Sequence, residues 1–253
     1  MLILLSPAKT LDFETKPIVC GINQPLFINE ANHLASLLAE FKPDDLSRLL
    51  SISKSLSLLN FERYQHWKMK AEEAGKPAIY AYKGDVYQGL NPDNWNDLTL
   101  DFAQKHLRII SGLYGYLRPL DPIKPYRLDM GTPLQPASSK NLYDFWSERI
   151  TAQISSELGR LNSDIILNLA SVEYSKVVEF KSLNAQVITP RFLDEKNGAY
   201  QMISYFAKRA RGLMASYVCT HRITNSAMII GFQGAGYHYS NTLSCPNSPV
   251  FVR

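Results

Sequence analysis

The spacing of apolar residues predicts alternating strands and helices along this chain. Short apolar runs at 2–5, 78–82 and 164–170 predict buried strands. Residues 186–193 are rich in β-branched and apolar side chains, and residues 200–206 alternate like a strand. Apolar residues recur at helical spacing in the segments 28–41, 43–56, 102–110, 142–158 and 208–222.

Further signals concern the helix boundaries and the number of domains. Asn141 stands where the N-cap of the helix over 142–158 is expected. The chain from Gly231 onward is rich in Gly, Asn, Ser and Tyr, which predicts an irregular tail. We find no internal repeat and no linker in the 253 residues. We therefore predict a single compact mixed α/β domain over residues 1–253, with a central sheet flanked by helices.

The stretch from Asp101 to Thr132 combines glycines, prolines and cations. Its predicted helix leads into Gly112 and Gly115, and three prolines then alternate with Arg118, Lys124 and Arg127. A helix, a glycine hairpin and a stiff basic exit together present backbone N–H groups and cations to a phosphate. The alternative is a helix C-cap followed by a long ordered loop.

Composition favours a soluble globular protein of the cytoplasm. The chain is 45% hydrophobic and 20% charged, and no apolar run approaches the roughly 20 residues that span a bilayer. The apolar start is too short for a signal peptide. Cys20, Cys219 and Cys245 are few and far apart, which fits a reducing compartment. We expect no membrane partner.

The charge distribution along the chain is asymmetric. The last acidic residue is Glu195, so residues 1–195 carry 21 basic and 23 acidic side chains. The rest of the chain carries six basic residues and no acidic one: Lys196, Lys208, Arg209, Arg211, Arg222 and Arg253. One-sided charge favours a polyanionic partner. The alternative is that these cations only solvate an ordinary surface.

The three predicted buried strands, at 2–5, 78–82 and 164–170, each end in a polar cluster. The clusters are Ser6, Lys9 and Thr10; Lys83, Asp85 and Tyr87; and Ser171, Glu173 and Tyr174. Ligands bind beyond the carboxyl ends of strands in open α/β sheets, so these clusters converge if the strands are parallel neighbours. Lys9 and Lys83 then suit a phosphate, while Asp85 and Glu173 suit proton transfer or orientation of a base. The alternative is ordinary loop polarity.

Common cofactor and metal motifs are absent from the sequence. Lys9 lacks the glycines of a phosphate-binding P-loop, and the chain contains no GxGxxG, GxSxG or HExxH pattern. The five histidines and three cysteines are scattered without metal-ligand spacing. We therefore predict no cofactor and no tightly held metal.

Several segments together resemble the YaaA family. They are 5–11, 83–87, 111–115, 117–121, 125–131, 168–171 with Glu173-Tyr174, 192–196 and 210–214. The resemblance implies a cytoplasmic bacterial protein of the hydrogen peroxide stress response that limits free intracellular iron. It also implies binding to double-stranded and branched DNA through a basic cleft and a helix-hairpin-helix element, on a family-specific α/β fold. It supplies no established enzymatic activity, and we infer no stable protein partner.

Two departures from the family pattern stand out. The usual hairpin signature is hydrophobic-x-Gly-hydrophobic-Gly, and residues 110–115 carry one extra residue before the second glycine. Pro119 and Pro122 also leave little room for a long second helix. The tail after Gly231 matches the family poorly.

Two functions remain open at this stage. The first is largely non-sequence-specific DNA binding through Gly112, Gly115, Arg118, Lys124, Arg127, Lys208 and Arg211. The helical pattern over 208–222 places Lys208 and Arg211 on the outer, solvent-facing side of that helix. We expect the proline-stiffened loop to contribute more than these two residues, because less ordering entropy is lost on binding. The second is an enzyme acting on a small phosphorylated or nucleotide-like molecule in a cleft lined by Lys9, Lys83 and Glu173. An open basic groove favours the first function, and a closed pocket favours the second.

Overall fold

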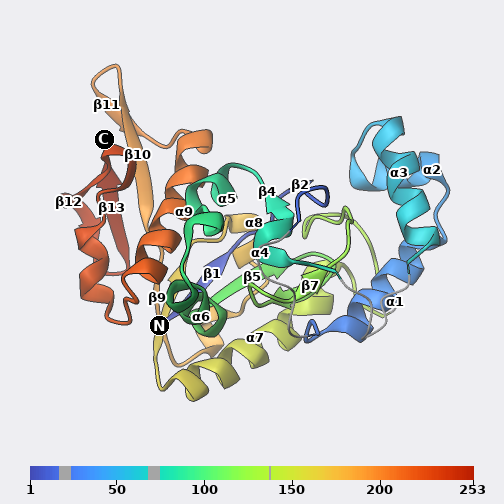
Figure 1. Ribbon diagram of the computed structural model, residues 1–253, viewed down its shortest axis with the longest axis horizontal. Helices are drawn as coiled ribbons and strands as arrows, with labels where there is room; N and C mark the ends of the chain where they lie inside the picture. The colour runs from blue at the N-terminus through green and yellow to red at the C-terminus, as the bar shows by residue number, and fades with distance from the viewer. Residues whose placement is uncertain (17–23, 68–74, 137) are drawn as a thin grey trace.

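The core of the protein is a five-stranded sheet. The computed structural model describes residues 1–16, 24–67, 75–136 and 138–253 (Figure 1). The strand order is β6-β5-β1-β8-β9. The strands are β1 (Leu2–Leu5), β5 (Leu107–Ser111), β6 (Gly115–Leu117), β8 (Ile165–Asn168) and β9 (Gln186–Ile188). β1 is parallel to both β5 and β8, whereas β6 returns antiparallel to β5. The predicted mixed α/β class is confirmed.

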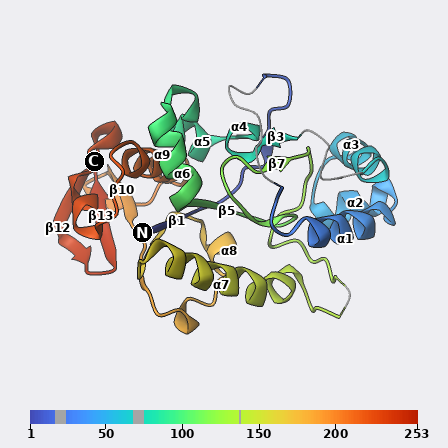
Figure 2. The same ribbon diagram turned by 60° about the horizontal axis from the view of Figure 1, so that its bottom comes forward.

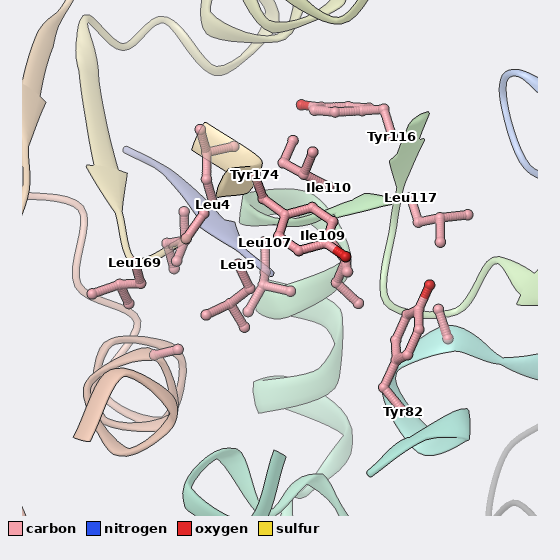
Figure 3. Packing of buried hydrophobic residues seen from close by; sticks show 14 of the residues in the cluster. Leu4, Leu5, Tyr82, Leu107, Ile109, Ile110, Tyr116, Leu117, Leu169 and Tyr174 are labelled. Atoms are coloured by element: carbon pink, nitrogen blue, oxygen red, sulfur yellow. The ribbon is translucent and has the colours of Figure 1, made fainter. Parts of the chain in front are cut away.

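The central strand β1 is buried on both faces. Leu2, Ile3, Leu4 and Leu5 are all 0% exposed, as expected for a continuous apolar run in a parallel sheet. Figure 3 shows Leu4 and Leu5 packed beside the apolar side chains of β5. The two strands thus share one hydrophobic core.

Helices cover both faces of this sheet. α7 (Leu142–Leu161) lies on one side, and α6 (Asp97–His106) and α9 (Ser204–Thr220) lie on the other (Figure 2). α7 begins as predicted, because the Asn141 side chain accepts the backbone N–H of Asp144 at 2.9 Å. The predicted helix over 43–56 is instead two helices, because Ser51 takes a left-handed conformation. α1 (Ile28–Ala39), α2 (Pro43–Leu50) and α3 (Lys54–Gln65) gather at one end of the molecule.

A second sheet lies at the other end of the molecule. Its order is β11-β10-β13-β12, formed by β10 (Arg191–Lys196), β11 (Ala199–Gln201), β12 (His238–Cys245) and β13 (Ser248–Val252). The prediction of an irregular tail after Gly231 is therefore wrong. Short 3-10 turns at Ser226–Gly231 and Gly234–Gly236 lead into the β12–β13 hairpin, and Val250, Phe251 and Val252 are buried.

The predicted strand over 78–82 is also wrong. Residues Ala78–Ala81 form the short helix α4, and the chain becomes extended only at β4 (Tyr82–Lys83). All four residues of α4 are buried, and a short apolar run buried on every side does not reveal its period. β4 pairs with β2 (Thr10–Leu11), and β3 (Lys76–Pro77) pairs with β7 (Pro122–Ile123). The predicted strand over 200–206 is confirmed only at Tyr200 and Gln201, which end β11, because α9 begins at Ser204.

The glycine segment after α6 is a β-hairpin. The helix stops at His106, residues 107–111 form β5, and β6 starts at Gly115. Gly115 has φ +67°, and a side chain there would collide with the Trp146 ring. A side chain on Gly112 would collide with the backbone oxygen of Leu128. Both glycines are buried, so the predicted role in presenting N–H groups to phosphate is not supported, and the helix-hairpin-helix element is not confirmed.

Arg118, in the basic exit after this hairpin, faces inward to a carboxylate. Its Nη2 lies 2.9 Å from Asp121 Oδ1, and its backbone N–H donates to Asp121 Oδ2 at 2.8 Å. Asp121 is 0% exposed, and this burial raises the pKa of its carboxyl to about 6. The Asp121 backbone oxygen also accepts the N–H of Ala78 at 2.9 Å. Arg118 therefore stabilises the fold at the start of α4.

Two helices on the same face of the sheet cross in very close contact. α5 (Asp85–Leu90) meets α9 where Gly89 and Gly212 lie. A Cβ on Gly212 would overlap the backbone oxygen of Val86, and one on Gly89 would overlap that of Arg209. The distance between the two helix backbones therefore requires glycine on both sides.

We expect Gly212→Ala to lower the free energy of unfolding by about 1–3 kcal/mol or more, because the added methyl group forces α5 and α9 apart. Gly159→Ala in α7 is the matched control, since a Cβ there meets nothing within 4 Å. We expect Gly159→Ala to raise the free energy of unfolding by up to about 1 kcal/mol, because alanine has a higher helix propensity than glycine. Urea denaturation of both variants measures the difference, and equal stability would show that the crossing tolerates a side chain.

We expect Arg118→Ala to lower the free energy of unfolding by about 2–3 kcal/mol at pH 8, because it leaves the Asp121 carboxylate buried without its cation. Arg118 is 32% exposed, so the loss stays below that of a fully buried pair. The folded pKa of about 6 lies above the ordinary 3.8, so the folded protein takes up the Asp121 proton as the pH falls through 6. The loss of unfolding free energy caused by Arg118→Ala should therefore be smaller at pH 5 and larger above pH 6.

The control for this experiment is Arg48→Ala. Arg48 pairs with Asp45 on the surface, with side chains 80% and 43% exposed. Its removal should cost less than about 1 kcal/mol at both pH values. A loss for Arg118→Ala that does not change between pH 5 and pH 8 would contradict the role of the buried carboxylate.

Candidate functional site

A pocket of about 600 Å³ opens where β1, β4 and β8 end. Its walls are residues 6–10, 83–86, 169 and 171–174, together with Lys208 and Arg211 of α9. The structure thus brings Lys9, Lys83, Asp85 and Glu173 together, the last from the short helix α8 (Val172–Ser175). The strand arrangement that brings these residues together differs in part from the prediction. β1 and β8 are parallel neighbours, but β4 belongs to the small sheet with β2.

Lys9 is held at the pocket by Asp129. The Lys9 Nζ lies 3.2 Å from Asp129 Oδ2, and Arg127 Nη2 lies 3.3 Å from the same oxygen. The Tyr174 hydroxyl donates to the other oxygen of Asp129 at 3.3 Å. Burial, together with the nearby Asp129 charge, raises the pKa of Tyr174, so this phenol stays protonated. Arg127 is therefore part of the scaffold behind Lys9.

Lys83 is held in a similar way by Asp12. The Lys83 Nζ lies 3.8 Å from Asp12 Oδ2 and 3.9 Å from Asp93 Oδ2. Asp12 also accepts the backbone N–H groups of Glu14 and Thr15, each at 3.0 Å. The hydrogen bond from Thr15 is the main reason that the pKa of Asp12 lies far below its usual range. Asp12 Oδ2 also lies 3.3 Å from Nζ of the buried Lys76, so Lys83 lies beside a fixed anion that it shares with a second lysine.

Hydrogen bonds also fix the ends of β1 and β8. The backbone N–H of Ser171 donates to Ser6 Oγ at 2.8 Å, and the hydroxyl of Tyr87 donates to the Ser6 backbone oxygen at 3.1 Å. Glu173 Oε1 accepts the backbone N–H of Gly131 at 3.0 Å. The pocket floor therefore has a defined geometry before any ligand binds.

Lys208 and Arg211 differ from the two held lysines. They lie one turn apart on α9, and neither forms a hydrogen bond or ion pair with another described residue. The helical pattern placed Arg211 on the solvent side, but the structure makes it half-buried in the pocket wall. Burial lowers the pKa of its guanidinium, which still remains a cation at neutral pH.

The other predicted DNA contacts do not line this pocket. Gly112 and Gly115 are buried, while Arg118 and Arg127 pair with carboxylates of their own loop. The backbone N–H of Lys124 donates to the Tyr114 hydroxyl at 2.9 Å. The loop over 118–131 thus supports the pocket from behind, through Asp129 and the N–H of Gly131.

Sequence reasoning missed Asp12 and Asp129 as the residues that orient the pocket lysines. Asp129 lies in the family motif over 125–131, which was the available signal. Asp12 follows directly on the polar cluster after β1 and gave no separate signal. Both act across long sequence separations, which spacing along one element does not show.

The part of the chain that the structure describes contains neither a metal-ligand cluster nor a membrane-spanning helix. Within residues 1–16, 24–67, 75–136 and 138–253, no three His, Cys, Asp or Glu side chains form a cluster suited to a metal ion. Cys219 is buried, which raises the pKa of its thiol, and Cys20 lies outside the described residues. In the same part of the chain, no helix has the length and apolarity needed to cross a bilayer.

Known proteins match this chain over nearly all of its length. Residues 1–243 match the family described as "Peroxide stress protein YaaA". A UPF0246 protein of Shewanella baltica (strain OS185) is 45% identical, over 100% of this chain and 99% of the relative. A UPF0246 protein of Cellvibrio japonicus (strain Ueda107) is 44% identical, over 100% of this chain and 98% of the relative. The chain therefore belongs to the YaaA family of peroxide stress proteins.

Proposed function

We propose that this peroxide stress protein acts through the pocket at the strand ends, where it binds a phosphorylated molecule of nucleotide size. The observation that carries the proposal is that Lys208 and Arg211, in the pocket wall, have no hydrogen-bond or ion-pair partner among the described residues. A half-buried cation without a carboxylate partner is costly, and an anionic ligand would offset that cost. Arginine is suited to phosphate because its guanidinium donates two parallel hydrogen bonds.

The shape and chemistry of the pocket support this proposal. Its volume of about 600 Å³ lies in the range of small-molecule sites. Lys9 and Lys83 are pre-oriented by Asp129 and Asp12, so little side-chain entropy is lost when they contact a ligand. Glu173 is the candidate for moving a proton, because it is anchored by one oxygen only. This arrangement suits an enzyme that acts on a phosphorylated or nucleotide-like substrate.

A second candidate function is DNA binding that is largely independent of sequence. The residues from Lys196 to Arg253 carry six cations and no carboxylate side chain, which favours a polyanion. The family resemblance implies double-stranded and branched DNA. The structure changes which residues we propose for the contact. Lys208 and Arg211 replace Arg118 and Arg127, which contact the carboxylates of Asp121 and Asp129.

We expect Lys83→Ala to abolish peroxide protection in a strain lacking this protein, with the melting temperature nearly unchanged. Lys83 is 42% exposed, so its loss removes a pocket cation without opening the core. Survival after hydrogen peroxide measures protection, and electron paramagnetic resonance of whole cells measures free iron. We propose that the effect on iron is indirect, so both readouts should fail together.

The matched control is Lys54→Ala, at the exposed start of α3 and away from the pocket. It should protect cells like the wild type. A strain carrying Lys83→Ala that also resists peroxide like the wild type would show that the pocket is not the working site.

For DNA, we expect Arg211→Ala to weaken binding to duplex and junction DNA more than Arg118→Ala does, at one fixed salt concentration. Each phosphate contact adds about −0.9 to the slope of log affinity against log salt on duplex DNA, so several contacts give a slope of a few units. Fluorescence anisotropy across a salt series measures both quantities. A flat salt response, or an Arg118→Ala variant that melts normally and binds least, would contradict this assignment.

A further inference from the structure

Positive and negative charge lie in separate segments of the pocket wall. α9 contributes Lys208 and Arg211, while Asp85 and Glu173 come from the segments after β4 and β8. No ion pair joins the two α9 cations to either carboxylate among the described residues. The pocket therefore presents a cationic wall and a separate group of acceptors to one ligand.

The charge balance of the pocket fits one phosphate monoester. Such a group carries about −1.5 to −2 charges at neutral pH, which two cations neutralise. Lys9 already shares the Asp129 carboxylate with Arg127, and Lys83 already lies 3.8 Å from Asp12 and 3.9 Å from Asp93. A second phosphate would therefore meet only lysines that already contact carboxylates, and it would also be repelled by Glu173.

The remaining lining suits an uncharged ring system with polar edges. Val172 is 80% exposed at the pocket, and Leu169 and Val86 add apolar surface. Glu173 Oε1 accepts the Gly131 N–H, and Oε2 accepts no hydrogen bond from the described residues. That oxygen can accept a ring N–H or a sugar hydroxyl from a ligand.

We infer that the pocket binds a nucleoside monophosphate, with the phosphate on Lys208 and Arg211 and the nucleoside against Val172 and Glu173. This inference rests on the proposed function, in which the ligand is a phosphorylated molecule of nucleotide size. A ribose phosphate alone would satisfy the cations and leave the apolar part of the lining in contact with water.

The test is isothermal titration calorimetry of the purified protein at low salt. The ligands are the four common nucleoside 5′-monophosphates, with ribose 5-phosphate, inorganic phosphate and the uncharged nucleosides as fragments. We expect at least one monophosphate to bind about tenfold or more tightly than every fragment, because both parts of the ligand gain contacts.

The matched variants are Arg211→Ala and Arg209→Ala. Arg209 is exposed on the same helix and outside the pocket, so both variants lose the same charge. Arg211→Ala should weaken the best monophosphate about tenfold or more, whereas Arg209→Ala should change it less than about twofold. Lys208→Ala, at an exposed position, repeats the test without risk to folding.

The outcomes separate this inference from the proposed function. If ribose 5-phosphate binds as tightly as every monophosphate, the inferred contact between the pocket and the nucleoside is wrong, while the proposed binding of a phosphorylated ligand is supported. If both Arg211→Ala and Lys208→Ala weaken the monophosphate no more than Arg209→Ala does, the assignment of the phosphate to α9 is wrong. If no phosphorylated compound binds, the proposed function fails together with the inference.

Discussion

The close crossing of α5 and α9 at Gly89 and Gly212 is the constraint on which the pocket depends. It joins the two helices backbone to backbone, with no room for a side chain between them. Asp85 at the start of α5 and Arg211 in the middle of α9 both line the pocket. The cationic wall is therefore fixed relative to the segment after β4. Neither glycine is near the left-handed region, so the need for glycine here is packing space and not backbone conformation.

A cation near the pocket is available to a ligand when no carboxylate of the protein already contacts it. Asp129 holds both Lys9 and Arg127, and Asp12 holds Lys83. These ion pairs are partly buried and fix geometry more than they add stability. Arg211 has no such partner among the described residues, so no carboxylate offsets its charge in the pocket wall. A count of basic residues in the sequence does not reveal this difference.

The sequence could predict the strand ends but not the elements that connect them. Residues 2–5 are all apolar, and only Asp164 and Asn168 are polar within 164–170, so both segments could be predicted as buried strands. The roles of the glycines at 112 and 115 could not be predicted. Close packing against Leu128 and Trp146 requires glycine, and the turn of a helical hairpin requires glycine too, so the sequence does not distinguish the two. The helical pattern predicted a solvent-exposed Arg211. Periodicity shows the faces of one helix, but it does not show which other segments pack against that helix.

The number of unpaired cations separates the two candidate functions physically. Lys208 and Arg211 suffice for one phosphate, but a DNA duplex presents a charge every ~1.7 Å and rewards a long row of contacts. Arg209 and Arg222 are exposed, yet they lie outside the pocket wall. DNA binding would therefore extend beyond the pocket along α9, and its affinity would fall strongly with salt. Binding of a small ligand would depend on Arg211, and its affinity would fall only weakly with salt. Because both ligands need Arg211, a nucleotide in the pocket and DNA on α9 would compete.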